Sequence, residues 1–337
     1  MTDEVSKFFF NLTPDRVLDA VEASGVRATG RVMALNSMEN RVYQVEIESD
    51  GEPESRFANF RVAKFYRPGR WSVEEILEEH EFISELAGGD IPVVAPLKFP
   101  DGSTLKKLKE YEIWYALFPR VGGRIRDEYS ESELERLGRL IARLHLIGAS
   151  KRFKKRWKIE SSEYGRRHLE YLLSSKALPD SVAGHYQRVV EQICTVSEPW
   201  FKGVPLLRVH GDLHLGNILW DNELCRLVDF DDTMTAPAVQ DIWLICPGRD
   251  AEAVKSREII ISAYESFREF NRETLRLIEP LRAFRIVRFS AWIHRRWQDP
   301  AFPRVFEEFG TEKYWREQLI ALDEIREIMT VVPAGVY

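Results

Sequence analysis

The sequence contains little cysteine. Three cysteines occur among its 337 residues, and they are far apart, at Cys194, Cys225 and Cys246. No two of them have the C-x-x-C spacing of a zinc site, and an odd number does not suit a framework of disulfide bonds. These absences favour a reducing compartment, so we expect the protein to be cytoplasmic.

Long apolar runs are absent as well. No run approaches the roughly 18 residues of a membrane-spanning helix. Residues 1–5 contain no basic side chain ahead of the aromatic residues 8–10, whereas a secretory signal peptide starts with a basic segment. We therefore expect neither a membrane anchor nor a signal peptide.

The sequence also has no excess of basic residues. Its 54 acidic residues outnumber its 48 lysines and arginines, which gives a formal net charge of -6. Binding to a nucleic-acid backbone requires a large positive excess, so we expect no nucleic-acid partner. The 44% hydrophobic and 30% charged residues are typical of a globular chain, and 337 residues suffice for two lobes of domain size. We expect a monomer.

The first third of the chain has the pattern of a small sheet with two helices. Pro14 after Thr13 begins one helix, which Gly25 can end. Ser72 and Glu75 form the capping box of a second helix that runs to residue 87. Alternating apolar residues and turn formers predict strands at 41–47, 57–65, 95–99, near Leu105 and at 113–118, the first two joined by a charged loop at 48–55.

The rest of the chain has mainly helical patterns. A capping box of Ser130 and Glu133 begins a helix whose apolar residues recur every three or four positions. Further helical patterns cover residues 181–198, 251–269, 272–298 and 311–329. We therefore expect an α+β fold of two lobes: a small antiparallel-sheet lobe at 1–118, a hinge containing Pro and Gly at 119–123, and a large helical lobe at 124–337.

One segment carries chemistry that the rest of the sequence lacks. Asp212 and Asn217 lie five residues apart on a predicted loop, and Asp229 follows the apolar pair Leu227 and Val228, where a short strand would end. Phosphoryl transfer needs a carboxylate near the attacking hydroxyl and oxygen ligands that hold Mg²⁺ against the phosphates. The segment therefore predicts a magnesium–nucleotide site, with Asp212 as the base and Asn217 and Asp229 as metal ligands.

The same segment resembles a known family. His210-Gly-Asp-Leu-His-Leu-Gly-Asn217 has the His-Gly-Asp-x-His-x-x-Asn pattern of aminoglycoside-phosphotransferase-like and choline-kinase-like enzymes, and Asp229-Phe-Asp replaces the Asp-Phe-Gly of protein kinases. Similarity to the bacterial Ser/Thr protein kinases of this family, which act in stress response, extends to residues 36–43, 62–68, 76–80, 121–124, 237–243 and 295–302. The resemblance spans nearly the whole chain and implies a two-lobed protein-kinase-like fold.

The resemblance implies an ATP site whose phosphate-binding residues lie in the small lobe. Lys64 would contact the phosphates of ATP, with Glu79 as its carboxylate partner and Glu78 as the competitor, since neighbours on a helix point about 100° apart. Ser37, in the turn at 36–40, would cover the phosphates in place of a Gly-rich loop; capping of that turn is its alternative role. Apolar contacts to adenine are expected from residues that are equally ordinary core types: Val62, Phe118, Leu219 and Val228.

Other residues near the loop give less specific signals. The resemblance assigns His210 and Asp241 to bracing the loop backbone, while a carboxylate favoured at a helix start is the simpler alternative for Asp241. His210, Asp212 and His214 have the alternating spacing of a metal-ligand cluster. That hypothesis gives no role to the other residues of the predicted nucleotide site, so we do not favour it.

Charged residues outside the motif have several interpretations. The basic stretch at 151–158 is typical of a solvated connector. Asp231 and Asp232 either assist a second metal ion or face solvent. A predicted helix carries Arg282, Arg285, Arg288 and the basic residues 294–296. Polycationic aminoglycosides would require an acidic pocket, so these arginines suit a peptide, an acidic substrate or internal ion pairs better.

The expected reaction is transfer of the γ-phosphoryl group of ATP, with Mg²⁺, to a hydroxyl. The resemblance implies Ser and Thr hydroxyls of proteins as acceptors, whereas the chemical segment alone suits a small alcohol or sugar equally well. A non-catalytic nucleotide-binding regulator is a third hypothesis, but it does not explain the joint presence of Lys64, Asp212, Asn217 and Asp229. The expected partners are ATP and a protein or small-alcohol substrate.

Overall fold

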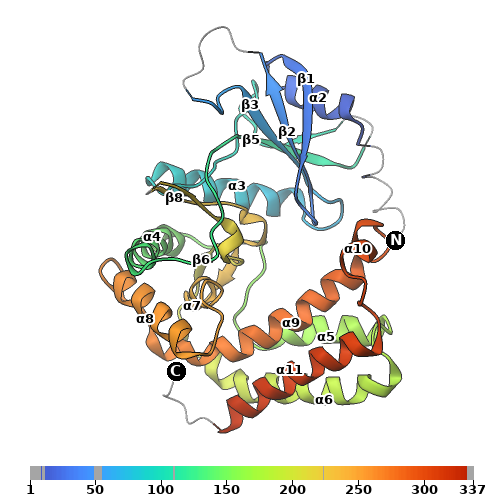
Figure 1. The fold of residues 1–337 in the computed structure, drawn as a ribbon, viewed down its shortest axis with the longest axis vertical. Helices are drawn as coiled ribbons and strands as arrows, with labels where there is room; N and C mark the ends of the chain where they lie inside the picture. Colours follow the sequence, from blue (N-terminus) through green and yellow to red (C-terminus); the bar gives the residue numbers. More distant parts are fainter. Residues whose placement is uncertain (1–8, 10–11, 49–54, 109–110, 223, 332–337) are drawn as a thin grey trace. The chain divides into compact units, whose positions relative to one another are not determined.

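The chain folds into two compact units (Figure 1), and the computed structural model describes residues 9, 12–48, 55–108, 111–222 and 224–331. The first unit comprises Met1–Glu128, Lys154–Arg156 and His214–Asp231, and the second comprises Tyr129–Phe153, Trp157–Leu213 and Asp232–Tyr337. The chemistry-bearing segment at 209–232 therefore contributes residues to both units. Most of the expected loop at 48–55, and two of the aromatic residues at 8–10, lie outside the described residues.

The first unit is built on a five-stranded antiparallel sheet with strand order β1-β2-β3-β5-β4. Its strands are β1 (Ala28–Leu35), β2 (Arg41–Ile47), β3 (Phe60–Phe65), β4 (Lys106–Lys107) and β5 (Trp114–Pro119). Lys64 on β3 lies opposite Val42 of β2 and Ala116 of β5. The central strand of the sheet therefore carries this lysine, with a hydrogen-bonded neighbour on each side.

The core of the first unit lies between the sheet and α2 (Pro14–Glu22) (Figure 1). Val17 and Val21 of α2 are buried together with Phe65 of β3 and Leu117 of β5. Phe65 also stacks on Tyr115, with 5.5 Å between ring centroids. Burial of aliphatic and aromatic side chains contributes roughly 1.5–3 kcal/mol each, so this layer holds β3 and β5 in place.

Helix α3 (Val73–Gly88) follows the sheet strand that carries Lys64. The backbone N–H of Glu75 donates to Ser72 Oγ at 3.2 Å, and the Ser72 N–H donates to Glu75 Oε2 at 2.8 Å, so the predicted capping box is present. The helix ends at Gly88, before the backbone turns at Gly89. Phe82 is fully buried and fixes which face of α3 points inward.

A two-stranded hairpin completes the first unit. Its strands are β7 (Ile218–Asp221) and β8 (Leu224–Leu227), and Ile218 lies opposite Leu227. Single bridges connect Val93 to Leu227 and Arg124 to Trp220. The hairpin therefore fixes the residues that flank it on both ends, namely Asn217 and Asp229.

The second unit is mainly helical. Its helices are α4 (Glu131–Ser150), α5 (Glu163–Ser174), α6 (Asp180–Ser197), α7 (Val239–Trp243), α8 (Ala251–Glu265), α9 (Ile278–Arg295), α10 (Ala301–Val305) and α11 (Glu312–Val331). The short strands β6 (Leu207–Val209) and β9 (Met234–Ala236) pair antiparallel. Helices α5 and α9 pack closely: a Cβ on Gly165 of α5 would lie 2.5 Å from the ring of Phe284 on α9.

The structure corrects several of the expected elements. The segment at 95–99 is not a strand, because Pro96 in its interior has no N–H to donate to a ladder, although the Leu97 N–H donates to the Leu117 carbonyl at 2.7 Å. The strand expected at 57–65 begins at Phe60, and the helix expected at 272–298 divides into a 3₁₀ helix, Arg272–Leu277, and α9. No element was expected at β1 or α5. Gly30, with φ of 90°, lies within the register shift of β1 and breaks its alternation.

The α+β class expected from the sequence is confirmed by the five-stranded antiparallel sheet and the helical remainder. Within the residues that the structure describes, no helix combines the length and the apolar character needed to cross a membrane.

Candidate active site

Lys64 forms a buried ion pair with Glu79 in the first unit. Its Nζ lies 3.2 Å from Glu79 Oε1, and both side chains are at least nine-tenths buried. The competitor Glu78 points elsewhere, as the 100° rotation between neighbouring helix positions requires. Its carboxylate accepts hydrogen bonds from the backbone N–H groups of residues 154–156, at 2.7–3.3 Å. Of these adjacent glutamates on α3, Glu79 pairs with Lys64 and Glu78 binds the backbone of residues 154–156.

Arg156 holds the second oxygen of Glu79. Its Nη2 lies 2.6 Å from Glu79 Oε2, its Nε donates to the Glu75 carbonyl at 2.7 Å, and its guanidinium lies 4.3 Å from the centre of the Trp71 ring. The expectation that the basic stretch at 151–158 is a solvated connector is therefore wrong for Arg156, which is 4% exposed. Its partners are 75 or more residues away in sequence, so no local pattern could have indicated this role.

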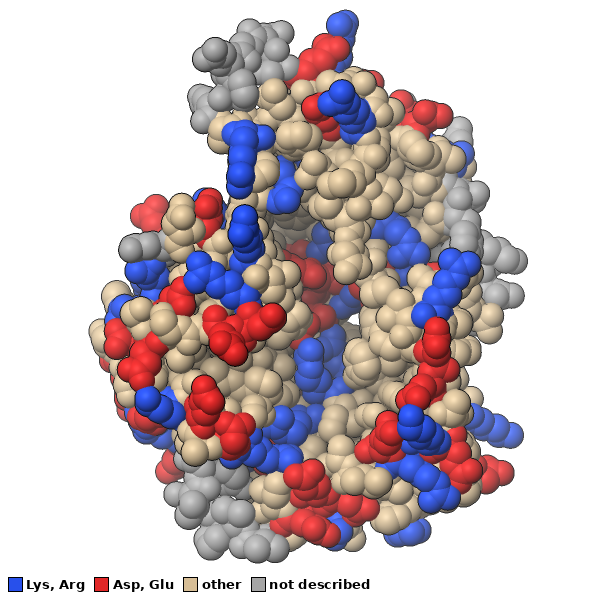
Figure 2. Space-filling model, viewed as in Figure 1, with Lys and Arg blue, Asp and Glu red and all other residues tan. Residues whose placement is uncertain are grey.

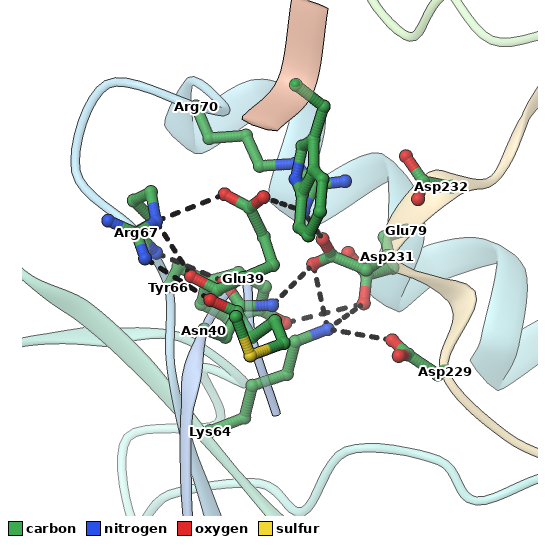
Figure 3. A network of polar contacts seen from close by, with 12 residues as sticks. Glu39, Asn40, Lys64, Tyr66, Arg67, Arg70, Glu79, Asp229, Asp231 and Asp232 are labelled. Atoms are coloured by element: carbon green, nitrogen blue, oxygen red, sulfur yellow. Dashed lines mark hydrogen bonds and ion pairs between the residues drawn. The ribbon is translucent and has the colours of Figure 1, made fainter. Parts of the chain in front are cut away.

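Asp231 lies at the centre of the same network, as Figure 3 shows. Its Oδ1 is 2.9 Å from Lys64 Nζ and accepts a hydrogen bond from Asn40 Nδ2 at 3.1 Å, and its Oδ2 is 2.6 Å from Arg70 Nη1. Arg156 also donates to the Asp231 carbonyl, at 2.6 Å. Asp231 is 4% exposed, so the expectation that it faces solvent is wrong. One feature of the sequence indicated that Asp231 is unusual: it stands where protein kinases have the glycine of Asp-Phe-Gly.

The charges in this network set its protonation. Burial by itself would lower the pKa of Lys64, but the carboxylates of Asp231 and Glu79 outweigh burial and raise the pKa well above the ordinary lysine value. Burial would likewise raise the pKa of Asp231, but the positive charges of Arg70 and Lys64 lower that pKa far below the ordinary range. At neutral pH the network therefore presents a charged ammonium group.

Asn217 and Asp229 flank the β7–β8 hairpin. The Val228 N–H donates to the Asn217 carbonyl at 3.0 Å, which brings the two flanking segments together beyond the last strand pair. Asp229 adopts a left-handed backbone, with φ of 60°, a conformation that costs a residue other than glycine roughly 1–3 kcal/mol. Its carboxylate is 58% exposed and lies 3.9 Å from Lys64 Nζ. An exposed carboxylate on a strained backbone, beside a buried lysine, suits a ligand-binding role.

The remaining nucleotide candidates also lie in the first unit. Ser37 is partly exposed in the turn between β1 and β2. Val62 of β3 lies opposite Phe118 of β5. Leu219 lies on β7 and Val228 directly follows β8. The four apolar candidates share partial exposure, in contrast to buried neighbours such as Ala63. Partly exposed apolar side chains are what an adenine ring requires.

Asp212 lies in the second unit, on a loop that begins after β6. Gly211 precedes it with φ of 87°, and a Cβ at that position would lie 2.2 Å from the Asp232 carbonyl oxygen. Only glycine combines this backbone with so close an approach. The Thr233 hydroxyl donates to the Val209 carbonyl at 2.6 Å and ties the loop to the chain that leads into β9.

Asp241 of α7 accepts hydrogen bonds from the backbone of the loop that carries Asp212. Asp241 Oδ2 accepts the His210 backbone N–H at 2.8 Å and Oδ1 accepts the Gly211 N–H at 2.8 Å. Its Oδ2 also lies 3.1 Å from Nε2 of the buried His145, which the sequence analysis missed. Burial would raise the pKa of Asp241, but the hydrogen bond and charge of His145, together with the loop N–H groups, lower it. The backbone next to Asp212 is therefore fixed by an ionised, buried carboxylate.

The two histidines of the motif make local backbone contacts. His210 Nδ1 accepts the Asp212 N–H at 3.4 Å, and His214 Nδ1 accepts the Gly216 N–H at 3.0 Å. Among the described residues, no group of three or more His, Cys, Asp and Glu side chains is arranged to hold a metal ion. These contacts account for both imidazoles without a metal-ligand cluster.

Two arginines of α9 pair with aspartates. Arg285 Nη1 contacts Asp212 Oδ1, and Arg288 Nη2 contacts Asp232 Oδ1. The four side chains are between 16% and 37% exposed. Of the alternatives for the α9 arginines, internal ion pairing applies to these two and to Arg282, whose Nε lies 3.4 Å from Glu279 Oε2. Asp232 therefore does not simply face solvent.

A known protein family matches a range that includes the candidate residues of both units. The phosphotransferase enzyme family (APH) matches residues 32–278, well over half of the chain. The chain belongs to this phosphotransferase family. The matched range contains Lys64, Asp212, Asn217, Asp229 and Asp241.

Curated relatives of this phosphotransferase cover nearly its whole length. Stress response kinase A of Escherichia coli (strain K12) is 38% identical over 326 residues, which are 96% of each chain. The Salmonella typhimurium (strain LT2) protein named serine/threonine protein kinase RdoA is 39% identical over 327 residues, again 96% of each chain. The resemblance to bacterial kinases of this family is therefore confirmed.

Solved structures agree on the fold. Amicoumacin kinase hAmiN, in complex with AMP-PNP, Ca²⁺ and Ami, has a TM-score of 0.71 at 18% identity and covers 94% of this chain and 92% of its own. A microcompartment-associated aminopropanol kinase has a TM-score of 0.65 at 17% identity, with coverage of 94% and 97%. The kinase-like fold is confirmed, and the chain is a phosphotransferase with a hydroxyl acceptor.

Proposed function

We propose that this phosphotransferase is a bacterial stress-response protein kinase that transfers the γ-phosphoryl group of Mg-ATP to Ser and Thr hydroxyls. The proposal is carried by the buried pair of Lys64 and Glu79, with the Asp229 carboxylate 3.9 Å from the same ammonium group. Kinases use such a lysine to hold phosphates and such an aspartate to hold the metal. The names of relatives that match 96% of the chain support a protein acceptor.

Asn217 and Asp229 fit a magnesium ion by their donor chemistry. Mg²⁺ prefers oxygen ligands and takes only one or two from the protein. The two residues flank one hairpin, joined by the hydrogen bond from Val228 to Asn217, and the Asp229 carboxylate is exposed. Bound Mg²⁺ would supply charge neutralisation at the phosphate oxygens.

The proposed nucleotide-binding residues all belong to the first unit. Lys64 binds the phosphates of ATP, and Ser37 offers its hydroxyl and N–H to them. The adenine ring is assigned to four apolar side chains: Val62, Phe118, Leu219 and Val228. In this proposal residues 1–118 cover the nucleotide, 119–123 act as the hinge, and 124–337 carry the catalytic loop and the acceptor.

Asp212 is the proposed base. The acceptor oxygen attacks the γ-phosphorus, and its proton passes to a carboxylate oxygen of Asp212. The bond between the γ-phosphorus and the bridging oxygen breaks, so ADP leaves with that oxygen and the acceptor becomes a phosphoester. Arg285 orients the carboxylate through its ion pair, and Asp241 fixes the loop backbone.

The cysteines suit a cytoplasmic enzyme. All three are free, and Cys194 and Cys225 are buried. Burial raises the pKa of the Cys194 thiol to about 12, so it stays protonated and unreactive. The thiols thus serve as packing groups, which is what a reducing compartment favours.

The purified chain with Mg²⁺ and γ-labelled ATP provides the test. We expect label in phosphoserine or phosphothreonine of protein substrates, and less in a panel of small alcohols and sugars. Asp212→Asn should reduce transfer by about 100-fold or more, the usual contribution of a general base, while nucleotide affinity measured by calorimetry is retained. Asp221→Asn, an exposed position on β7, is the matched control and should transfer normally.

Three results would contradict parts of the proposal. Full activity of Asp212→Asn would reject the base. Transfer to small alcohols alone would reject the protein acceptor. Nucleotide binding with no transfer to any hydroxyl would favour the regulator over the enzyme.

A further inference from the structure

One surface of the second unit combines arginine with aromatic side chains. We define the α5–α9 surface by six residues: Trp157, Tyr164, Arg167, Tyr171, Arg288 and Arg295. Tyr164 and Tyr171 are seven residues apart on α5, and Arg288 and Arg295 are seven apart on α9, so each pair shares one helix face. Figure 2 shows basic side chains gathered over α9, in the lower centre of the view.

Ring contacts hold this surface together. Trp157 and Tyr164 meet edge to face at 6.0 Å between centroids, and the Arg288 guanidinium lies 5.6 Å from the Trp157 ring. The Arg295 guanidinium lies 3.9 Å from the centre of the Tyr171 ring. Stacking on an aromatic face orients an arginine and leaves its N–H edge available to bind an anion.

The arginines of α9 differ in their partners. Arg285 and Arg288 pair with Asp212 and Asp232. Across the part of the chain that the structure describes, Arg295 has no carboxylate partner, and its charged neighbours are Arg288 and Arg167. A bound anion would stabilise a half-buried guanidinium whose charged neighbours are other arginines.

We propose that the α5–α9 surface binds acidic side chains that accompany the Ser or Thr of a peptide substrate. This inference rests on the proposed protein-kinase function and specifies its substrate class. Arg295 donates to a carboxylate in the bidentate geometry that a guanidinium favours, and the exposed Arg167 adds positive charge. A polycationic acceptor would meet repulsion on the same surface.

Helix geometry sets the distance between the acid and the hydroxyl. Arg285, which pairs with Asp212, precedes Arg295 by ten residues on α9, which corresponds to about 15 Å along the helix. An extended peptide advances about 3.3 Å per residue. The preferred acidic residue therefore lies about four or five positions from the phosphorylated residue.

Peptide kinetics provide the test. A serine peptide with glutamates four and five positions away, on either side, is compared with the same peptide carrying glutamine or lysine there. We expect kcat/KM to be about tenfold higher for the acidic peptide, mainly through a lower KM, because charge-assisted pairs are stronger than neutral ones. Arg295→Gln should remove that preference, and Arg295→Lys should keep part of it. Arg188→Gln, an exposed arginine on α6, is the matched control.

The outcomes separate the inference from the function on which it rests. Two results would reject acid binding by the α5–α9 surface without contradicting the protein-kinase function. One is equal transfer to all peptides, and the other is an acidic preference that persists in Arg295→Gln. Transfer to no peptide, while the chain still binds ATP, rejects the protein kinase itself. Faster transfer to glycerol 3-phosphate than to any peptide would show that the α5–α9 surface binds a small anionic substrate and not a peptide. The unfolding midpoint of each variant checks folding, and Arg167→Gln, at an exposed position, should weaken the preference if Arg295→Gln does not fold.

Discussion

Arg156 forms a buried ion pair with Glu79, 77 residues away in sequence, with 2.6 Å between Nη2 and Oε2. The other carboxylate oxygen of Glu79 pairs with Lys64. Glu78, the neighbour of Glu79, accepts the backbone N–H groups of the segment that carries Arg156. Two adjacent glutamates of α3 therefore fix this segment, one through its backbone and the other through its arginine, and Arg156 orients the carboxylate partner of Lys64.

Replacing Arg156 with leucine should therefore destabilise the chain and weaken nucleotide binding. Removal of one partner from a buried ion pair typically costs about 3–5 kcal/mol, because the other charge stays buried. We expect a loss of that order in the free energy of unfolding measured with urea, and a higher KM for ATP. Arg152→Leu, at an exposed position nearby, is the control. Wild-type stability of the Arg156 variant would mean that Glu79 does not depend on it.

Asp231→Gly would recreate the Asp-Phe-Gly sequence of protein kinases, yet we expect it to impair the enzyme. Asp231 neutralises Lys64 and Arg70, and its loss leaves these two buried cations in mutual repulsion. Stability should fall by about 3–5 kcal/mol in urea unfolding, and the activity per folded molecule should drop. Asp231→Asn, which keeps the size but not the charge, should show most of the effect. Unchanged stability of the asparagine variant would contradict a charge role.

The sequence predicted those parts of the fold that depend on local chemistry. The capping box at Ser72 and Glu75 predicted the start of α3, and the alternation at 41–47 predicted β2 with its bounds. It missed β1, where Gly30 interrupts the alternation, and it predicted a strand at 95–99, where Pro96 has no N–H to donate. Propensity and periodicity are averaged over several neighbouring residues. They therefore do not predict an element whose structure depends on one irregular residue.

The residues of the candidate site likewise include some that the sequence predicted and some that it did not. The motif residues stand close together in sequence, so their spacing pointed to Asp212, Asn217 and Asp229. Arg156 and Asp231 were not predicted as members of the lysine network, because their roles arise from partners that are remote in sequence. A buried arginine needs a carboxylate, but the sequence does not tell which arginine is buried.

Asp241→Asn should reduce turnover by loosening the loop before Asp212. The asparagine side chain retains one oxygen acceptor where the carboxylate has two, so one of the N–H groups of His210 and Gly211 would face an amide donor. An unsatisfied buried donor costs about 1–3 kcal/mol. We expect kcat to fall at least about tenfold, the equivalent of 1.4 kcal/mol, with KM for ATP little changed. Asp250→Asn, at the start of α8, should leave kcat unchanged.

Two buried histidines should make the stability sensitive to mild acid. Burial lowers the pKa of His168 to about 3 and that of His80 to about 4. Within the described residues neither ring nitrogen of His168 has a hydrogen-bond partner, whereas His80 contacts Tyr66 and Thr104, each at 2.8 Å. Since an unfolded histidine has a pKa near 6.5, the unfolded chain binds more protons than the folded chain between that pH and about 4.

The free energy of unfolding should accordingly be nearly constant between about pH 7 and 8 and fall as the pH drops from 6.5 to 5. Each histidine contributes a loss of up to about 1.4 kcal/mol per pH unit in this window. The carboxylates of Asp231 and Asp241 have lowered pKa values, so their contributions are lost only below about pH 5 and do not interfere. Urea unfolding at closely spaced pH values measures the slope. His168→Phe should reduce the slope, and His80 and the half-buried His294, whose pKa burial also lowers, should account for the remainder. The exposed His185→Gln should leave the slope unchanged. An unchanged slope in His168→Phe would show that His168 is not a buried neutral group.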